Sequence, residues 1–295
     1  MNHTTLLIFK LVAETQSVTQ AAKQLGRAQS NITTRIQQLE EELEAELFVR
    51  GNKKMLLSPA GQNFLSYARR ILSLAEEAKL ALHPARPAGT LKLGAMEACA
   101  ASRLPAILPL FQQRCPDADL TLRTMPTRQL TELVENSTLD CALVSLPAGP
   151  DGSLQCPQTI EYLPLFIEQL VLIAPVDRRD YRFAAFPAGC SYRQRGIEYL
   201  QQTGTHVDIV DVSSYHAMMA NVATGRYACL LPESVLALLT LPAGCQTQYV
   251  TQAATQLIWR RGYVSPILDA LRQLLLTPAT GNQPGGSQQH AAGRQ

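Results

Sequence analysis

Polar side chains that can read DNA bases cluster between Gln29 and Arg35. Glutamine and asparagine can form paired hydrogen bonds with adenine, and arginine can do the same with guanine. Serine and threonine hydroxyls can bind phosphate oxygens or contact the methyl group of thymine. We therefore expect the following side chains to contact DNA: Gln29, Ser30, Asn31, Thr33, Thr34 and Arg35. The alternative is that these residues only cap a helix and keep its surface solvated.

The apolar residues interleaved with this polar stretch predict the helix that presents it. They recur at spacings of four, three and four and form one stripe: Ile32, Ile36, Leu39 and Leu43. The helix would run from about Gln29 to Glu44. A shorter helix over residues 18–25 precedes it, opened by a Ser17 cap and closed by Gly26. Two helices joined by a tight turn that contains glycine predict a helix-turn-helix.

A basic hairpin is predicted directly after the two helices. Residues 47–49 and 55–57 are short apolar runs on either side of a Gly51–Lys54 turn, a pattern typical of paired strands. Arg50, Lys53 and Lys54 would lie at the tip of this wing and reach the DNA backbone or the minor groove.

A long helix is predicted from Ser58-Pro59 to about residue 83, because serine caps helices and proline fits their first turn. Apolar residues follow at the 3.5-residue period of a coiled-coil seam. The seam consists of Phe64, Ala68, Ile71, Ala75, Ala78 and Leu82. We therefore expect a homodimer or a homotetramer. The alternative is a single amphipathic helix docked on its own domain.

From about residue 91, strand-like and helix-like segments alternate, which predicts a parallel sheet with helices on both faces. Ligands in such sheets bind beyond the carboxyl ends of strands, close to helix N-termini. Four segments fit this rule, and they supply Glu97, Ala98 and Cys99; Ser145; Cys190, Ser191, Tyr192 and Arg193; and Tyr215 and His216.

Glu97 beside Arg193 would suit a ligand that has both an amine and an acid. We therefore expect a small carboxylate or an amino acid-like effector. The alternatives are that both residues only begin helices and that His216 packs in a core.

The composition narrows the class of protein. The 295 residues suffice for two domains, and no run of about 18 apolar residues predicts a membrane span. The N-terminus lacks the pattern of an export signal, so we expect a cytoplasmic protein. Seven separate cysteines without CxxC pairs argue against a disulfide scaffold or a zinc site. Because no nucleotide, metal or hydrolase pattern is found, we expect no enzyme, no cofactor and no metal.

Four segments together resemble the LysR-type transcriptional regulators: Ser17-Val18-Thr19-Gln20-Ala21-Ala22, Ile36-Gln37-Gln38-Leu39-Glu40-Glu41-Glu42-Leu43, Leu47-Phe48-Val49-Arg50 and Leu57-Ser58-Pro59-Ala60-Gly61. The resemblance covers residues 4–276 and is looser after residue 91. It implies an N-terminal winged helix-turn-helix with a long linker helix, and a C-terminal α/β effector-binding domain of two subdomains, similar to a periplasmic binding protein. One departure is Ala28-Gln29-Ser30, where the family usually has Ser-Gln-Pro, so Ser30 must supply another helix cap.

The resemblance and the composition together give the expected domain bounds. These are a DNA-binding domain over 1–58, a linker helix over 59–83, a hinge over 84–90, an effector-binding domain over 91–280 and a disordered tail over 281–295. Within the effector-binding domain, subdomain I would hold residues 91–162 and 263–280, and subdomain II residues 163–262.

The resemblance implies a sequence-specific regulator of transcription whose DNA binding responds to a small-molecule effector. A dimer would recognise a two-fold symmetric promoter site in double-stranded DNA, and RNA polymerase could be a further partner. An alternative is a redox-sensing regulator of the same fold, in which the Cys190 thiol lies near Arg193 at a helix N-terminus and is activated there.

Overall fold

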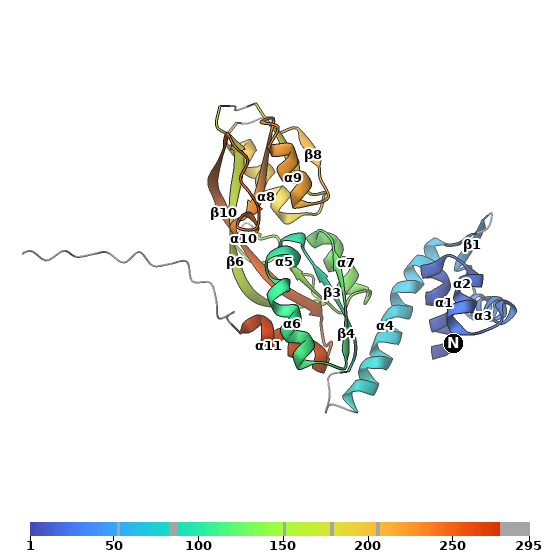
Figure 1. Cartoon of the computed structure of the whole chain (residues 1–295). Coiled ribbons are helices and arrows are strands. Elements are labelled where there is room, and N and C mark those ends of the chain that lie inside the picture. The colour runs from blue at the N-terminus through green and yellow to red at the C-terminus, as the bar shows by residue number, and fades with distance from the viewer. Residues whose placement is uncertain (52–53, 83–87, 150–151, 178–179, 205–206, 278–295) are drawn as a thin grey trace, which may run out of the picture.

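The computed structural model describes residues 1–51, 54–82, 88–149, 152–177, 180–204 and 207–277. A small helical domain and a larger sheet domain are joined by one long helix (Figure 1). Lys53, most of the predicted hinge and the whole predicted tail lie outside the described residues. None of the helices in the described part of the chain is long and apolar enough to span a membrane.

The N-terminal domain consists of α1 (His3–Thr15), α2 (Val18–Leu25), α3 (Gln29–Glu42), β1 (Phe48–Gly51) and β2 (Lys54–Leu57). Both predicted caps of α2 are confirmed. The Ser17 hydroxyl accepts from the Gln20 N–H at 3.3 Å, and Gly26 ends the helix with a φ of 61°. Ile32, Ile36 and Leu39 are buried, so the apolar stripe of α3 faces the core.

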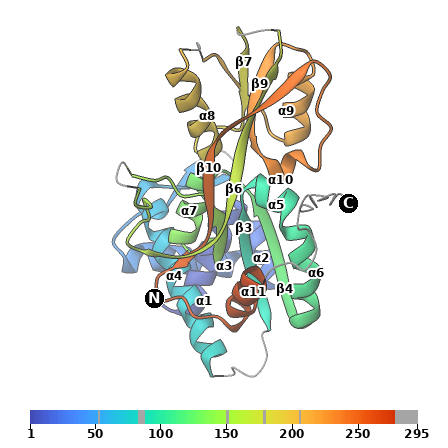
Figure 2. The ribbon, with the colours of Figure 1, turned by 90° about the vertical axis from the view of Figure 1, so that its left-hand side faces the viewer.

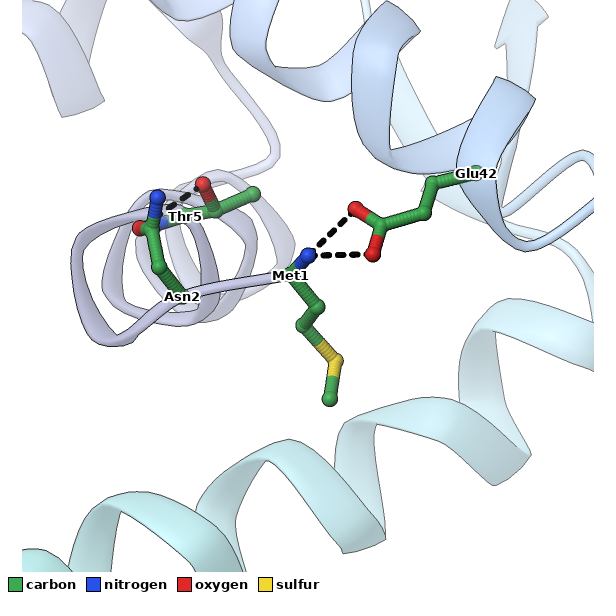
Figure 3. A network of polar contacts seen from close by, with 4 residues as sticks. All are labelled: Met1, Asn2, Thr5 and Glu42. Atoms are coloured by element: carbon green, nitrogen blue, oxygen red, sulfur yellow. Dashed lines mark hydrogen bonds and ion pairs between the residues drawn. The ribbon is translucent and has the colours of Figure 1, made fainter.

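The start of the chain is held against the end of α3. Asn2 caps α1, because its side-chain oxygen accepts from the Thr5 N–H at 2.9 Å and from the Thr5 hydroxyl at 3.0 Å (Figure 3). The Met1 ammonium group pairs with the Glu42 carboxylate, so α1 and α3 are joined at this corner (Figure 3).

Helix α4 (Pro59–Ala81) packs on α1 and connects the two domains. Gly61 allows the first turn of α4 to pass close to the chain at Leu47. A Cβ atom at position 61 would lie 2.0 Å from the Leu47 carbonyl oxygen, so a side chain there requires the backbone to move. The Ser58 hydroxyl accepts from the Gly61 N–H at 2.9 Å and caps this turn, as its sequence predicts.

The larger domain is built on an eight-stranded sheet with the order β4-β3-β5-β10-β6-β9-β7-β8. Its strands are β3 (Gly89–Ala95), β4 (Ala118–Thr124), β5 (Cys141–Val144), β6 (Ile160–Pro175), β7 (Arg182–Ala185), β8 (Ile209–Asp211), β9 (Tyr227–Pro232) and β10 (Cys245–Arg260). Its helices are α5 (Glu97–Ser102), α6 (Leu104–Arg114), α7 (Thr127–Glu135), α8 (Ser191–Gln202), α9 (Tyr215–Val222), α10 (Glu233–Leu236) and α11 (Pro266–Leu276).

The prediction of a parallel sheet is correct only within each half of this domain. Strand β3 pairs in parallel with β4 and β5, and β7 pairs in parallel with β8 and β9. The long strands β6 and β10 pair antiparallel with each other and run from one half into the other (Figure 2). The sheet is therefore mixed, because two strands cross between the halves.

A buried ion pair lies on the first crossing strand. Glu168 of β6 is 5% exposed, and its carboxylate accepts from Arg103 Nη2 at 2.7 Å and from Arg103 Nε at 3.0 Å. The same guanidinium lies 4.5 Å from the centre of the Phe166 ring. Because Arg103 lies between α5 and α6, the pair fixes one half of the domain to the strand that leads into the other.

Helix α4 also contacts the sheet domain. Arg260 Nη2, at the end of β10, lies 2.6 Å from the Glu77 carboxylate on α4. The two side chains are 18% and 10% exposed, so most of this pair is shielded from water. The pair joins the helix that carries the DNA-binding domain to the strand that spans both halves of the sheet domain.

Candidate functional site

The outer face of α3 forms an open groove, called here the reading groove. It is lined by Ala28, Ser30, Asn31, Thr34, Arg35 and Gln38. All six residues are exposed, while the opposite face of the helix is buried. Ser30, Asn31, Thr34 and Arg35 were predicted to contact DNA, and the structure brings these four together. Gln38 was missed, although it follows Thr34 by four residues and therefore lies on the same helical face.

Gln29 and Thr33 are held by local hydrogen bonds instead. The Gln29 side-chain oxygen accepts from the Thr19 hydroxyl on α2 at 3.2 Å. The Thr33 hydroxyl donates to the Gln29 carbonyl at 3.1 Å. The Gln29 bond joins α3 to α2 and the Thr33 bond lies within α3, and neither side chain lines the reading groove.

The start of α3 differs from the prediction. Ala28 is the N-cap residue and provides no side-chain cap, and Ser30 lies inside the first turn. Ser30 therefore does not replace the missing cap. The Asn31 N–H donates to the Ala28 carbonyl at 3.1 Å, whereas the N–H groups of Gln29 and Ser30 precede the first intrahelical acceptor. An uncapped N-terminus leaves them available for a phosphate oxygen.

The hairpin after α3 has the predicted form. Strands β1 and β2 pair antiparallel, with Arg50 opposite Met55 and Gly51 opposite Lys54. Lys54 is exposed, as contact with a DNA backbone requires. The backbone of Arg50 belongs to β1, and Lys53 lies outside the described residues.

A cavity of about 200 Å³ lies between the two halves of the sheet domain and is called here the effector cavity. One half contributes Met96, Glu97, Ala98 and residues 124–127. The other half contributes Phe186, Pro187, Cys190, Tyr192, Ser213 and Tyr215. Most of these residues directly follow the strands β3, β4 and β7 or begin the helices α5, α8 and α9, as the strand-end rule predicts.

The wall of this cavity is aromatic and carries one acid. Phe186 and Tyr215 meet edge to face with ring centres 5.0 Å apart. The hydroxyl of Tyr192 is buried and has no hydrogen-bond partner within the described residues. Burial raises the pKa of Tyr192 and of Tyr215, so both hydroxyls stay protonated. Glu97 is the one ionisable carboxylate among the described lining residues.

Comparison with known proteins identifies both domains. Residues 3–62 match the bacterial regulatory helix-turn-helix proteins of the lysR family, and residues 84–279 match the LysR substrate binding domain. The chain belongs to the LysR family of transcriptional regulators. It is therefore a DNA-binding regulator with a substrate-binding domain, and this family consists of non-enzymatic proteins.

Relatives and solved structures cover nearly the whole LysR-family chain. It is 31% identical over 290 residues to the regulator GltR of Bacillus subtilis, covering 95% of this chain and 93% of GltR. It is 34% identical over 238 residues to the regulator YofA of Bacillus subtilis, covering 78% and 81% of the two chains. A full-length OxyR variant of Pseudomonas aeruginosa has the same fold, with a TM-score of 0.73, 19% identity and coverage of 93% and 94%.

One similar structure contains DNA. CbnR in complex with its target DNA has a TM-score of 0.62 and 24% identity to this regulator, covering 93% of this chain and 99% of CbnR. At this sequence identity the similarity to CbnR establishes the fold alone.

The structure separates the predicted effector residues of this regulator into two groups. Glu97, Ala98, Cys190, Tyr192 and Tyr215 line the effector cavity. The others do not, and they are Cys99, Ser145, Ser191, Arg193 and His216. His216 is exposed, so the alternative that it packs in the core is also wrong.

The predicted pairing of Glu97 with Arg193 across one site is not found. Arg193 donates to the Phe186 carbonyl at 2.9 Å and pairs with Asp211, and it lines a neighbouring hollow with Ser191. Its charge is already balanced there. Ser145 is fully buried, and its hydroxyl accepts from Arg195 at 3.1 Å.

Residues 124–127 and Phe186 line the cavity and were missed. Residues 124–127 end or follow β4, so extending the strand-end rule to that strand would have found them, whereas β7, which precedes Phe186, was not predicted from the sequence.

The cysteines of this regulator are all free, and four of the seven are buried. Burial is the largest influence on the Cys190 thiol and raises its pKa, although nearby Arg193 acts in the opposite direction. Burial likewise raises the pKa of Cys99 to about 12. A redox-sensing thiol needs a lowered pKa, so this environment does not favour the redox alternative.

The predicted seam of α4 divides into two parts. The rings of Phe64 and Phe9 meet edge to face with their centres 5.1 Å apart, and Ala68 is fully buried. Both Phe64 and Ala68 therefore belong to the core of the DNA-binding domain. Farther along, Ala75 is half-buried and Ala78 is exposed. Four exposed apolar residues, called here the exposed row, lie along α4 and directly after its end: Tyr67, Ile71, Leu74 and Leu82, of which Ile71 and Leu82 belong to the predicted seam.

Proposed function

We propose that this regulator reads its promoter site through the reading groove and that a small ligand with a positively charged amine controls it from the effector cavity. The observation that carries the ligand assignment is the charge of the cavity wall. Glu97 is the single acidic side chain among the described residues that line it. An arginine or lysine would favour an acidic ligand, and that lining contains neither.

The aromatic residues support the same assignment. An ammonium group is attracted to the face of an aromatic ring, and Phe186, Tyr192 and Tyr215 surround the space near Glu97. The unpartnered Tyr192 hydroxyl oxygen can accept a hydrogen bond from the amine. A volume of about 200 Å³ suits a small amine with an apolar body better than a larger polyamine.

From the sequence we expected a ligand that also carries a carboxylate, but the structure leaves this carboxylate without its expected partner. Arg193 was to bind it, and that guanidinium is held by Asp211 and by the Phe186 carbonyl. The amine half of the expected amino acid-like ligand keeps its partner, which is Glu97.

The position of the cavity suggests how the ligand acts. Glu97 comes from one half of the sheet domain, and Phe186 and Tyr215 come from the other. A ligand that contacts both halves binds best when they are closed on it and shifts the population toward that arrangement. Because Glu77 on α4 is paired with Arg260 of crossing strand β10, closure can change the angle of the DNA-binding domain.

Two copies of the chain would pair through the exposed row of α4. Its members Tyr67, Ile71, Leu74 and Leu82 are between 41% and 77% exposed, which is costly for apolar side chains in water. A dimer formed there would present two α3 helices to the two halves of a symmetric DNA site.

A thermal-shift titration of the full-length protein tests the ligand class. Phenethylamine should raise the melting temperature, while phenylacetate, of similar size and opposite charge, should not. Glu97→Gln should abolish the shift. Glu198→Gln, which removes an exposed carboxylate on α8, should keep it. A shift with phenylacetate and none with phenethylamine would contradict the proposal.

A further inference from the structure

A second hollow, separate from the effector cavity and from the reading groove, lies where the DNA-binding domain meets the sheet domain. Its volume is about 480 Å³. The DNA-binding domain and α4 contribute Lys10, Glu14 and Arg69, and the sheet domain contributes Lys92, Arg123 and Ser137. We propose that this basic hollow binds a small polyanion that carries a phosphate, a sulfate or several carboxylates, and that the anion bridges the two domains.

The balance of charge in the basic hollow favours an anion. Four basic side chains line it with one acid, Glu14, which is exposed and pairs with Arg69 at 3.2 Å. A second acid, Asp140, lies nearby: its carboxylate accepts from the Lys92 backbone N–H at 2.7 Å and interacts with the charges of Lys92 and Lys10. The described residues therefore set four basic side chains against two acidic ones at this junction, which leaves an excess of positive charge.

The state of Lys10 reflects the same imbalance. Burial is the main cause that lowers the pKa of this half-buried amine, and the charges of Lys92 and Arg69 lower it further. Glu14 and Asp140 act in the opposite direction and do not compensate. A bound oxyanion would relieve the repulsion among these cations and stabilise the protonated amine.

Two buried polar atoms of the hollow also lack partners. Arg69 Nε and the Ser137 hydroxyl are inaccessible to water and make no hydrogen bond within the described residues. Leaving such a buried group unpaired costs stability. Both groups can donate to an oxyanion when their side chains turn into the hollow, and an oxyanion accepts several hydrogen bonds at once. They come from different domains, Arg69 from α4 and Ser137 from the turn after α7.

Because the side chains of the basic hollow come from both domains, a bound anion would affect how the two domains are arranged. An anion that binds Arg69 and Lys10 on one side and Lys92, Arg123 and Ser137 on the other needs the two domains docked as they are in Figure 1. It therefore stabilises the docked arrangement over any other. The Glu77–Arg260 pair holds the same junction, so anion and ion pair act together.

Calorimetric titration of the full-length protein with inorganic phosphate, at an ionic strength held constant with potassium chloride, tests the proposal. The same titration with sulfate and with citrate distinguishes a site for phosphate from a site for polyanions in general. We expect saturable binding by the parent protein. Arg123→Gln should weaken it about tenfold, the value of one charge-assisted hydrogen bond.

Three further variants make the test specific. Lys10→Gln removes a cation from the other domain and should also weaken binding, as a bridging anion requires. Arg226→Gln removes an exposed cation of the sheet domain outside the hollow and should bind phosphate like the parent. Arg35→Ala should also bind normally, which excludes phosphate bound at the DNA surface.

The proposal is overturned if phosphate binds no better than chloride, or if Arg123→Gln binds like the parent. Loss of binding in Arg123→Gln with normal binding in Lys10→Gln would overturn the bridging role.

Discussion

The Glu77–Arg260 pair between α4 and β10 gives a quantitative prediction about how the two domains are joined. Glu77 also accepts from the Ser73 hydroxyl at 3.0 Å, and its side chain is 10% exposed. Burial is the largest influence on its carboxyl group and raises its pKa, and the charge of Arg260 only partly offsets this. The pair therefore does not fully repay the cost of taking the carboxylate out of water.

Two substitutions at this position should behave differently. Glu77→Gln keeps an oxygen that can accept from Arg260 and removes the buried charge, so we expect a change in the free energy of unfolding within about 1 kcal/mol. Glu77→Ala leaves the Arg260 guanidinium, which is 18% exposed, without its partner. Breaking a fully buried pair costs roughly 3–5 kcal/mol, and the partial exposure reduces this to about 2 kcal/mol.

The pH dependence provides a second check. Because the pKa of Glu77 is raised on folding from its ordinary value of 4.5, the folded protein holds this proton more tightly than the unfolded chain does. The contribution of Glu77 to stability is therefore greatest below pH 4.5 and is lost as the pH rises through the folded pKa. As the pH rises through the folded pKa of Glu77, the Glu77→Gln variant should therefore become more stable relative to the parent protein.

Differential scanning calorimetry of the full chain at several pH values measures both effects. Glu77→Ala should melt about 4 °C or more below the parent, and Glu77→Gln close to it. Equal losses in both variants, or a Glu77→Gln difference that does not change with pH, would refute this reasoning.

Three further predictions concern other parts of the molecule. Leu74→Glu should shift the protein toward monomer in sedimentation velocity, whereas Leu238→Glu, on an equally exposed apolar residue outside α4, should not; a dimer that survives Leu74→Glu would exclude the exposed row. Gly61→Ala should lower the stability of the DNA-binding domain by about 2 kcal/mol or more in urea unfolding, because of the backbone contact at 2.0 Å; an unchanged midpoint would contradict that contact. Tyr192→Phe should raise the melting temperature, because it removes a buried hydroxyl without a partner, and should weaken amine binding; a lower melting temperature would indicate a partner for that hydroxyl.

The sequence predicted best the elements whose pattern is local. The stripe from Ile32 to Leu39 repeats at helical spacing, and that face of α3 is buried in the structure. Strand β10 was missed, because its first half is polar and exposed, as at Gln246 and Gln248. It is held by its long pairing with β6, a contact between distant segments that periodicity does not reveal.

The effector cavity could be predicted in part for a related reason. The strand-end rule found Glu97, Cys190 and Tyr215, because each stands near the start of a helix. Which side chains point into the cavity depends on the turns between the strands and the helices. Arg193, on the first turn of α8, is instead held by Asp211 at the end of β8, a partner that no sequence spacing indicates.

The seam of α4 shows the same limit. One apolar stripe could face either a partner chain or the helix's own domain, and the sequence does not decide between them. Phe64 packs against Phe9 of α1, so the first turns of the stripe are used within the chain. The exposed row that starts at Tyr67 is not covered by the described residues of its own chain, and we propose that a partner covers it.

The most direct test of the account is selection of binding sites from a pool of random DNA duplexes by the full-length protein. The parent should enrich a two-fold symmetric site. Arg35→Ala and Asn31→Ala should each lose preference for a base in both half-sites, with about 1–3 kcal/mol less discrimination there. Arg226→Gln should enrich the site of the parent. If Arg35→Ala and Asn31→Ala enrich that same site with unchanged preference at every position, the reading groove of α3 does not read the bases.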